Sequence, residues 1–443
     1  MSGTIVALST STATMAGINI VRMSGEKAKS IADQIFESKS IKNKVMSPNH
    51  MYLGNIKTDK FTEKAFCVYY KKPKSYTGED VIEFHCHGGA LVANAIVELC
   101  LEKGCRPAQA GEFTQRAFFN GKLDLSQAEG IMEIISATNQ SQLIQGYKLM
   151  HGEVSKGIYD MEQRLLRLMA NLEVRLDYPE ETEDEPDLEY QEEIKDIIQR
   201  IKILLKNAKY AKTINEGVDV AIVGLPNVGK SSLLNGLIMQ DRAIVTDIAG
   251  TTRDVISHTI ELDGIKINIL DTAGIRESRD KIERMGIERT KESIKAAEIV
   301  IFVTDLSQPE TKEEREIEKL IKDKKVIRVA NKKDIEKYPR KQSLYIKANP
   351  PRDIQAVKEE LLRLAERDKI FSNEIIFTNQ RHIHCLKKAK ELLENTLEEF
   401  SLVGAECNLV GLREAYGWLA KITGHDISES VAKEVFSTFC VGK

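Results

Sequence analysis

Eight residues near the middle of the chain have the types and spacing of a phosphate-binding loop. GLPNVGKS runs from Gly224 to Ser231, directly after the apolar run VAIV. Its glycines let backbone N–H groups curl around phosphate oxygens, while Lys230 can reach the β- and γ-phosphates and the Ser231 hydroxyl can bind Mg²⁺. We therefore expect a nucleotide to be contacted here by Asn227, Val228, Gly229, Lys230, Ser231 and Ser232.

Two further motifs follow in the order in which GTP hydrolases carry their switch segments. Thr251-Thr252-Arg253-Asp254 is expected to form a loop in which Thr252 completes the coordination of Mg²⁺. Asp271-Thr272-Ala273-Gly274 ends an apolar run, which would place Asp271 near the metal and the Gly274 amide near the γ-phosphate.

A fourth motif predicts which base is bound. Asn331-Lys332-Lys333-Asp334 follows the strand-like run KVIRVA. The Asp334 carboxylate can accept hydrogen bonds from N1 and the exocyclic amine of guanine, whereas adenine offers no donor there. The nucleotide is therefore predicted to be GTP or GDP. The usual fifth element, Ser-Ala, is replaced by Lys347-Ala348, so only the backbone role of Ala348 carries over.

The residues that would drive hydrolysis are less well defined. Ras-like proteins orient water with a glutamine after the Asp-Thr-Ala-Gly motif, but this chain has Ile275 there. Acidic candidates downstream are Glu277 and Glu283. Positive charge beside the phosphates could come from Arg253 or Arg276, or from a monovalent cation held by the side-chain oxygen of Asn227, which lies inside the phosphate loop.

Composition restricts the broad class of protein. The chain has 443 residues, 42% of them hydrophobic and 30% charged, which suggests a soluble protein of two to four domains. No apolar run is long enough for a membrane span, and no signal peptide is evident. Seven cysteines without metal-like pairs favour the cytoplasm. A net charge of −3 excludes a uniformly basic nucleic-acid binder.

Patterning predicts a multidomain fold. We expect an α+β domain over 1–118, a helical domain in two parts over 119–212 and 369–443, and an inserted α/β P-loop domain over 213–368 with a Ras-like mixed sheet. Asp263-Gly264 between two alternating runs is a hairpin signal. Expected strands in the inserted domain are 218–224, 255–262, 265–270, 298–304, 325–330 and 343–347.

The whole chain resembles the tRNA uridine-5-carboxymethylaminomethyl modification GTPases of the MnmE (TrmE) family. The resemblance rests on GLPNVGKSSLLN, AIVTDIAGTTRDV, DTAGIRESRDKIERMGIER, GEDVIEFHCHGG, AGEFTQRAFFNGKLDLSQAEGI and the terminal FSTFCVGK. It implies a homodimer whose G domains pair across a K⁺ ion. It also implies that Glu283 positions water, that Asn227, Thr246, Ile248 and Thr251 bind K⁺, and that Thr246, Asp247, Ile248, Ala249, Gly250, Thr251 and Thr252 contact GTP.

The same resemblance implies a tRNA substrate and a protein partner. The family acts as a heterotetramer with the FAD-dependent protein MnmG (GidA) on C5 of the wobble uridine, at position 34. The resemblance further implies that the N-terminal domain binds a tetrahydrofolate derivative, in the 5-formyl or methylene form, as carbon donor. Matching positions for the folate are Arg22, Glu83, Lys122 and Lys443. Residues 10–17 and 347 depart from the family pattern.

The terminal FCVGK places Cys440 fourth from the end, where a prenylated cysteine would stand. Gly442 and Lys443 do not fit the aliphatic and terminal positions of such a box. We expect instead that Phe436 and Phe439 anchor a short tail, which carries Cys440 as a catalytic thiol or as a docking contact.

Competing functions remain open at this point. A purely regulatory or ribosome-assembly GTPase would not need the N- and C-terminal blocks. A folate-binding one-carbon module with a regulatory GTPase inserted is a third possibility. In HCHGG, His85 and His87 project to one face of a strand without further ligands at metal-binding spacing, which favours structural packing.

Overall fold

A computed structural model describes residues 3–11, 16–41, 45–178, 187–240, 256–270, 283–349, 351–372, 374–425, 427 and 429–442. The chain forms two compact units. One comprises residues 1–132, 148–195 and 388–443, and the other comprises residues 133–147 and 196–387. The domain boundaries expected from the sequence at 118, 212 and 368 stay predictions.

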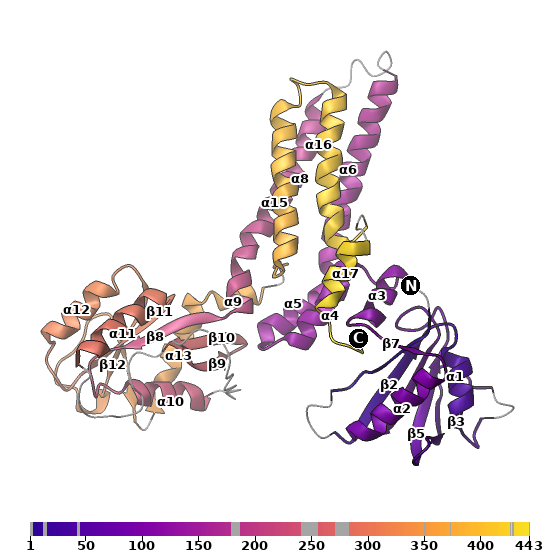
Figure 1. Ribbon diagram of the computed structural model, residues 1–443. Helices are drawn as coiled ribbons and strands as arrows, with labels where there is room; N and C mark the ends of the chain where they lie inside the picture. Colours follow the sequence, from indigo (N-terminus) through magenta and orange to yellow (C-terminus); the bar gives the residue numbers. More distant parts are fainter. Residues whose placement is uncertain are drawn as a thin grey trace. The chain divides into compact units, whose positions relative to one another are not determined.

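The first unit contains a seven-stranded sheet in the order β3-β4-β5-β6-β2-β1-β7 (Figure 1). Its neighbours pair antiparallel except β1 and β7, which are parallel. The strands are β1 (Ile5–Leu8), β2 (Ile18–Ser24), β3 (Phe36–Glu37), β4 (Met51–Lys57), β5 (Thr62–Tyr70), β6 (Val81–His87) and β7 (Arg106–Pro107).

One face of this sheet is covered by helices α1 (Ala28–Ile35) and α2 (Ala90–Glu102). Val21, Met23 and Phe84 point into the core beneath them and are fully buried. The strands form because apolar residues alternate with polar ones at period two. The opposite face stays partly exposed over β4, β5 and β6, where Met51, Leu53 and Phe66 are open to solvent.

Helices of 8 to 25 residues make up the rest of the first unit, and α4, α5, α8 and α15 also contribute residues to the second unit. The expected apolar stripe Leu165, Leu168 and Leu172 on α6 is buried, which confirms the amphipathic pattern, and α6 packs against α16. These helices are α3 (Glu112–Phe119), α4 (Leu125–Ser136), α5 (Gln140–Met150), α6 (Glu153–Asp177), α8 (Asp187–Asn207), α15 (Gln380–Glu399), α16 (Ala405–Thr423) and α17 (Glu429–Ser437).

The second unit contains a six-stranded sheet in the order β13-β12-β11-β8-β10-β9. The hairpin expected at Asp263-Gly264 joins β9 to β10, and both turn residues have positive φ, as a type I′ turn requires. β9 is antiparallel to its neighbour and the other strands pair parallel, as the sequence predicted. The strands are β8 (Val218–Val223), β9 (Ile256–Leu262), β10 (Ile265–Leu270), β11 (Ile299–Asp305), β12 (Lys325–Asn331) and β13 (Leu344–Tyr345).

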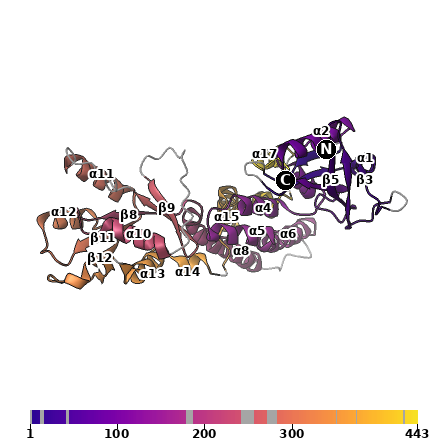
Figure 2. The same cartoon turned by 90° about the horizontal axis from the view of Figure 1, so that it is seen from below.

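Helices cover both faces of this sheet (Figure 2). Leu233 and Leu237 of α10 and Ile354 of α13 pack on one face, and Ile294 of α11 packs on the other. The helices of this unit are α9 (Ala211–Asn215), α10 (Lys230–Gln240), α11 (Glu283–Ala296), α12 (Lys312–Leu320), α13 (Ile354–Leu364) and α14 (Arg367–Ile370), with 3₁₀ turns at Ala208–Tyr210 and Lys333–Ile335.

The structure differs from the prediction of a single strand over 343–347. It divides into β13 and a separate short strand, β14 (Lys347–Ala348), which pairs with β15 (Pro351–Arg352). The backbone leaves the large sheet after Ile346, whose N–H still donates to Ala330 O at 2.9 Å. The Ala348 amide then donates to Asn331 Oδ1. The hydrogen bond to the buried Asn331 side chain thus takes the place of a further backbone hydrogen bond to β12.

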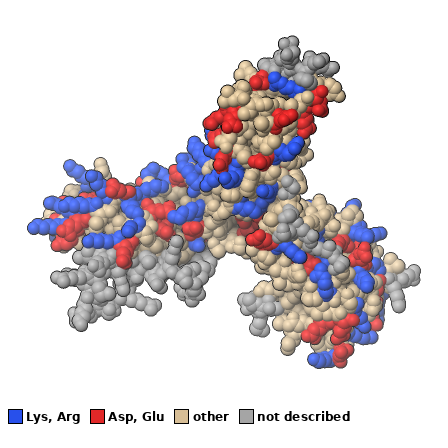
Figure 3. Space-filling view, turned by 45° about the horizontal axis from the view of Figure 1, so that its top comes forward, with Lys and Arg blue, Asp and Glu red and all other residues tan. Residues whose placement is uncertain are grey.

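Surface charge is mixed on the face shown in Figure 3, where Lys and Arg side chains are interspersed with Asp and Glu. This distribution agrees with the net charge of −3. Within the described part of the chain, no helix is long and apolar enough to cross a membrane.

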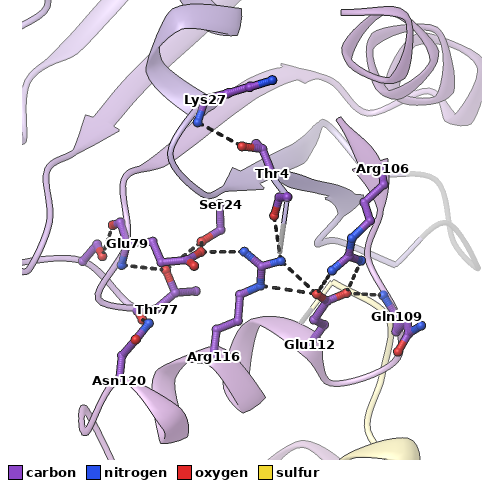
Figure 4. A network of polar contacts seen from close by, with 12 residues as sticks. Thr4, Ser24, Lys27, Thr77, Glu79, Arg106, Gln109, Glu112, Arg116 and Asn120 are labelled. Atoms are coloured by element: carbon purple, nitrogen blue, oxygen red, sulfur yellow. Dashed lines mark hydrogen bonds and ion pairs between the residues drawn. The ribbon is translucent and has the colours of Figure 1, made fainter. Parts of the chain in front are cut away.

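A buried ion network fixes α3 to the first sheet (Figure 4). Glu112 accepts hydrogen bonds from Arg106 and Arg116, and Arg116 also donates to Glu79 at 2.8 Å and to the Gly3 carbonyl at 2.9 Å. Burial alone would raise the pKa of Glu112, but hydrogen bonds from both arginines and the Gln109 amide lower it to about 2. The carboxylate therefore stays charged when folded at every physiological pH.

Glu112→Gln is expected to destabilise this domain by about 3 kcal/mol, because it removes one partner from a buried ion network. Since the folded pKa lies below the ordinary value of 4.5, the stabilisation is complete above that pH. It is lost as the pH falls towards 2. Chemical unfolding at several pH values measures both effects. Glu102→Gln, at the exposed end of α2, is the matched control. Equal stability of the two variants at pH 7 would contradict the assignment.

Candidate functional site: a phosphate loop, a base-binding turn and a docked C-terminal tail

The phosphate loop leaves the carboxyl end of β8 and enters α10 at Lys230. Gly224 and Gly229 have φ values of +152° and +100°, where a side chain is disfavoured. A Cβ atom on Gly229 would lie 2.1 Å from Asn331 Nδ2, so the close approach of the two loops also requires glycine. Asn227 adopts φ +60°, and its side chain is exposed.

The side chain of Lys230 is hydrogen-bonded to the first residues of this loop. Its ammonium donates to the carbonyls of Gly224 at 3.0 Å and Leu225 at 2.8 Å. Burial lowers its pKa from the usual value. Ser231, in the first turn of α10, is exposed, and Ser232 is half-buried. The loop therefore presents one lysine and one exposed hydroxyl at a helix N-terminus, an arrangement suited to phosphate and a hydrated cation.

Asn331 connects the phosphate loop to the base-binding turn. Its buried side chain donates from Nδ2 to Val228 O at 2.8 Å. Its Oδ1 accepts from the Lys332 amide at 2.8 Å and the Ala348 amide at 2.9 Å. One side chain thus fixes Val228, Lys332 and Ala348, all three of which were expected near the nucleotide.

Each charged side chain of the base-binding turn has an ionic partner. Lys332 Nζ lies 2.5 Å from Asp305 Oδ2 and Lys333 Nζ lies 3.1 Å from Asp353 Oδ2. The Asp334 carboxylate lies 2.8 Å from Lys347 Nζ. Sequence reasoning did not single out Asp305 or Asp353. The signal for Asp305 was its place at the carboxyl end of a buried parallel strand, where ligand-binding residues gather.

Several predicted nucleotide contacts lie outside the described residues. Glu283 begins α11, but its side chain is not among those described. Of the predicted contacts, Thr246, Asp247, Ile248, Ala249, Gly250, Thr251, Thr252, Asp271, Thr272, Ala273 and Gly274 fall in the undescribed segments, as do Arg253, Arg276 and Glu277.

Arg22 and Glu83 form a second polar site on the first sheet. They are cross-strand neighbours on β2 and β6, and Arg22 Nε donates to Glu83 Oε1 at 2.8 Å. The guanidinium lies over the rings of Tyr76 and Phe113, with 5.6 and 5.7 Å to the centroids. Burial raises the pKa of Tyr76. Sequence reasoning missed both rings, which belong to a loop and to α3.

Lys122 contacts the same loop that carries Tyr76. Its exposed ammonium donates to Pro73 O at 3.0 Å, and its side-chain carbons lie beside Gly78. The loop over 73–78 therefore contacts both Arg22 and Lys122, which are far apart in sequence. The third predicted lysine, Lys443, lies outside the described residues.

The C-terminal tail docks beside Arg22. Phe436 and Phe439 are buried against α3 and α4, and the Gly111 amide donates to Cys440 O at 3.2 Å. Gly442 O accepts hydrogen bonds from Ser9 Oγ at 3.0 Å and Arg22 Nη1 at 3.4 Å. The Cys440 residue itself is exposed. The tail is thus fixed by its backbone while the residue that carries the thiol stays accessible.

His85 and His87 pair with carboxylates. His85 Nε2 lies 3.3 Å from Glu83 Oε2, and His87 Nδ1 lies 2.7 Å from Glu63 Oε1. Among the described residues, no cluster of histidine, cysteine or acidic side chains could hold a metal ion. His85 accordingly belongs to the polar site around Glu83.

Comparisons with known proteins agree with this arrangement. A family model described as the MnmE helical domain matches residues 125–440, and one described as the N-terminus of the GTP-binding protein TrmE matches residues 4–122. The tRNA modification GTPase MnmE of Aquifex aeolicus is 41% identical over 439 residues, covering 96% of each chain. That of Natranaerobius thermophilus is 39% identical over 459 residues, covering 99% of each.

A partial likeness to a solved structure exists as well. The G domain of the T. maritima FeoB iron transporter is 23% identical, with a TM-score of 0.26, and the likeness covers 33% of this chain and 98% of that chain. The full-length matches and the two domain models confirm the resemblance that the motifs predicted. This chain belongs to the MnmE family of GTPases.

Proposed function

We propose that this chain is a K⁺-activated GTPase that acts with an FAD-dependent MnmG partner. The pair would convert C5 of the wobble uridine of certain tRNAs to a (carboxymethyl)aminomethyl group. The methylene carbon would come from a tetrahydrofolate one-carbon unit and the carboxymethylamino group from glycine, and the released tetrahydrofolate would take up the C5 hydrogen and one amine hydrogen. Membership of the family makes the chain a GTP hydrolase that takes part in tRNA modification. The observation that carries the finer proposal is the docking of the Cys440 tail beside Arg22 and Glu83.

The phosphate loop supports binding of GTP with Mg²⁺. Its glycines leave room for close approach, and Lys230 stands at the loop mouth. Ser231 is exposed at the N-terminus of α10, where Thr252 would join it as a ligand of the metal. Bound Mg²⁺ and K⁺ would supply positive charge beside the phosphates. The residues of the chain orient the nucleotide, with Asp334 reading the base and Glu283 positioning water.

The position of Asn227 supports a monovalent cation site. The residue lies within the phosphate loop at φ +60°, with an exposed side chain that offers an amide oxygen. Amide, hydroxyl and backbone oxygens are suitable ligands for K⁺, and Thr246, Ile248 and Thr251 would complete the set. Arg253 and Arg276 lie outside the described residues, and we assign the neutralising charge to the cation.

GTP turnover is expected to be at least tenfold faster in KCl than in NaCl at matched ionic strength. We expect K⁺, but not the smaller Na⁺, to fit the proposed set of oxygen ligands and to bring together the P-loop domains of two copies of the chain. Release of phosphate from GTP by the full-length chain measures the rate. Asn227→Ala should reduce the rate in KCl to that in NaCl while leaving GDP affinity within about threefold. Equal wild-type rates in the two salts would exclude activation by K⁺.

The first sheet supports a folate site and a homodimer. The Glu83 carboxylate could accept from pterin N–H groups, and Arg22 with Lys122 and Lys443 could meet the carbonyl or the glutamate tail. Met51, Val68, Glu83 and Arg22 form one cross-strand row, in which Val68 next to Glu83 is buried and Met51 at the far end is exposed. Covering this face with a second copy would bury Leu53 and Phe66, which are 44% and 41% exposed.

The state of the cysteines supports a reducing compartment such as the cytoplasm. All seven are free thiols, and Cys67, Cys86, Cys100, Cys105 and Cys385 are buried. Burial raises the pKa of the Cys86 and Cys105 thiols to about 11, which makes them poor nucleophiles. Cys407 and Cys440 remain as the exposed thiols.

A further inference from the structure

Lys347 occupies the place at which GTP-binding loops ordinarily carry a serine. Its Nζ lies 2.8 Å from Oδ2 of Asp334, the carboxylate proposed to read guanine. The side chain of Lys347 is 27% exposed and that of Asp334 is 43% exposed. An ion pair so open to water contributes little to stability. The ion pair matters instead because the Lys347 ammonium occupies an oxygen of the Asp334 carboxylate that the base would otherwise use.

The backbone on both sides of Lys347 is fixed to the base-binding turn. The Ile346 carbonyl accepts from the Lys333 amide at 3.1 Å, and the Ala348 amide donates to Asn331 Oδ1 at 2.9 Å. The backbone of Lys347 is therefore held at a defined position beside the base-binding turn. The neighbouring lysines are engaged elsewhere, because Lys332 pairs with Asp305 and Lys333 pairs with Asp353.

The chemistry of the base determines what this ammonium does. Guanine presents two N–H donors, one to each carboxylate oxygen, so an ammonium on Oδ2 competes with one of them for the same negative charge. Xanthine has the N1–H donor but a carbonyl at C2, which would face a carboxylate oxygen and repel it. A lysine ammonium between these two oxygens can donate to both, since it carries three N–H groups.

We propose that Lys347 is a specificity-determining residue that lowers the preference of this site for guanine over xanthine. It shares the Asp334 carboxylate with guanine, and it bridges the carboxylate to the C2 carbonyl of xanthine. The inference rests on the proposed reading of the base by Asp334. A serine at this position would offer a hydroxyl without the charge and without the length to reach the base.

The test compares the dissociation constants of GDP and XDP by displacement of a fluorescent nucleotide from the full-length chain. Lys347→Ser is expected to raise the ratio of XDP to GDP dissociation constants at least tenfold, mainly by weakening XDP, while GDP binding stays within about threefold. Lys347→Arg keeps a charged donor and should hold the ratio near the wild-type value. An unchanged or lower ratio in Lys347→Ser overturns the inference.

Two further variants separate the possible causes. Lys333→Ser removes a lysine charge from the base-binding turn itself without removing the partner of Asp334, so its ratio should stay within twofold of the wild type. A rise equal to that of Lys347→Ser would mean that general electrostatics is responsible and would overturn the inference. Asp334→Asn should shift preference towards XDP. If it does not, the base-reading role of Asp334 fails, and that outcome is distinct from failure of Lys347 alone.

Discussion

Replacing Cys440 by serine is expected to remove the modified wobble uridine from cellular tRNA while leaving GTP turnover unchanged. Serine has nearly the same shape and keeps the backbone contacts of the tail, but a hydroxyl is a much weaker nucleophile than a thiol. The Cys440 carbonyl is held by Gly111, and the next glycine along the tail is held by Ser9 and Arg22. The level of the modified uridine should therefore fall more than a hundredfold, while the rate of GTP turnover should not change.

The measurement is mass spectrometry of nucleosides from tRNA of cells in which the variant replaces the wild-type chain. Cys407→Ser, at the other exposed thiol, is the control and should leave the modified nucleoside at its normal level. Normal levels in Cys440→Ser would show that the thiol takes no part in the chemistry.

A second pair of variants tests docking separately from the chemistry of the thiol. Gly442 has φ +94°, and a Cβ there would lie 2.4 Å from Leu8 O, so Gly442→Ala should displace the tail. Gly104→Ala carries the same backbone strain at φ +98° with no atom within 4 Å. Loss of modification in Gly442→Ala but not in Gly104→Ala supports a docked tail. Loss in Gly442→Ala with none in Cys440→Ser would leave docking as the only role of the tail.

Asn331→Ala is expected to weaken GTP and GDP binding by about a hundredfold. Hydrogen bonds of this kind are worth about 1 kcal/mol each, and here they join Val228, Lys332 and Ala348. Without them the phosphate loop and the base-binding turn are free to separate. Titration of the full-length chain with a fluorescent GDP measures the change.

The matched control for this variant is Asn268→Ala in the same domain. Asn268 is equally buried and donates to Glu216 O at 2.9 Å and Asp219 Oδ1 at 3.0 Å. It lies on β10 rather than in a nucleotide-contacting loop, so its loss should cost similar stability without weakening nucleotide binding. Equal losses of affinity in the two variants would mean that Asn331 acts only through stability.

The sequence predicted the α/β domain well because its signals are local. Strand periodicity, the Asp263-Gly264 turn and the Gly224–Ser231 loop each depend on neighbouring residues alone. The ion pairs around the base-binding turn were not predictable in this way, because Asp305 and Lys347 meet the turn from other strands. The division of the strand expected over 343–347 depended on Asn331, a buried acceptor seventeen residues from Ala348 in the chain.

The N-terminal site was predicted by resemblance rather than by pattern. Arg22 and Glu83 are distant in sequence, and only the pairing of β2 with β6 makes them neighbours. The aromatic cover of Arg22 by Tyr76 and Phe113 had no sequence signal, since single aromatic residues more often belong to a core. The docking of the tail required Gly111 and Gly442, whose positive φ values become visible only in the fold.

The most direct test of the proposed function is reconstitution with purified components. The mixture contains the full-length chain, its FAD-dependent MnmG partner, unmodified tRNA, GTP, MgCl₂, KCl, methylene-tetrahydrofolate and glycine, which supplies the carboxymethylamino group. The wobble nucleoside is identified by mass spectrometry. We expect the C5-modified uridine in the complete mixture, and none when the chain or GTP is omitted. Formation of the modified uridine without this chain, or its absence from the complete mixture, would contradict the proposal.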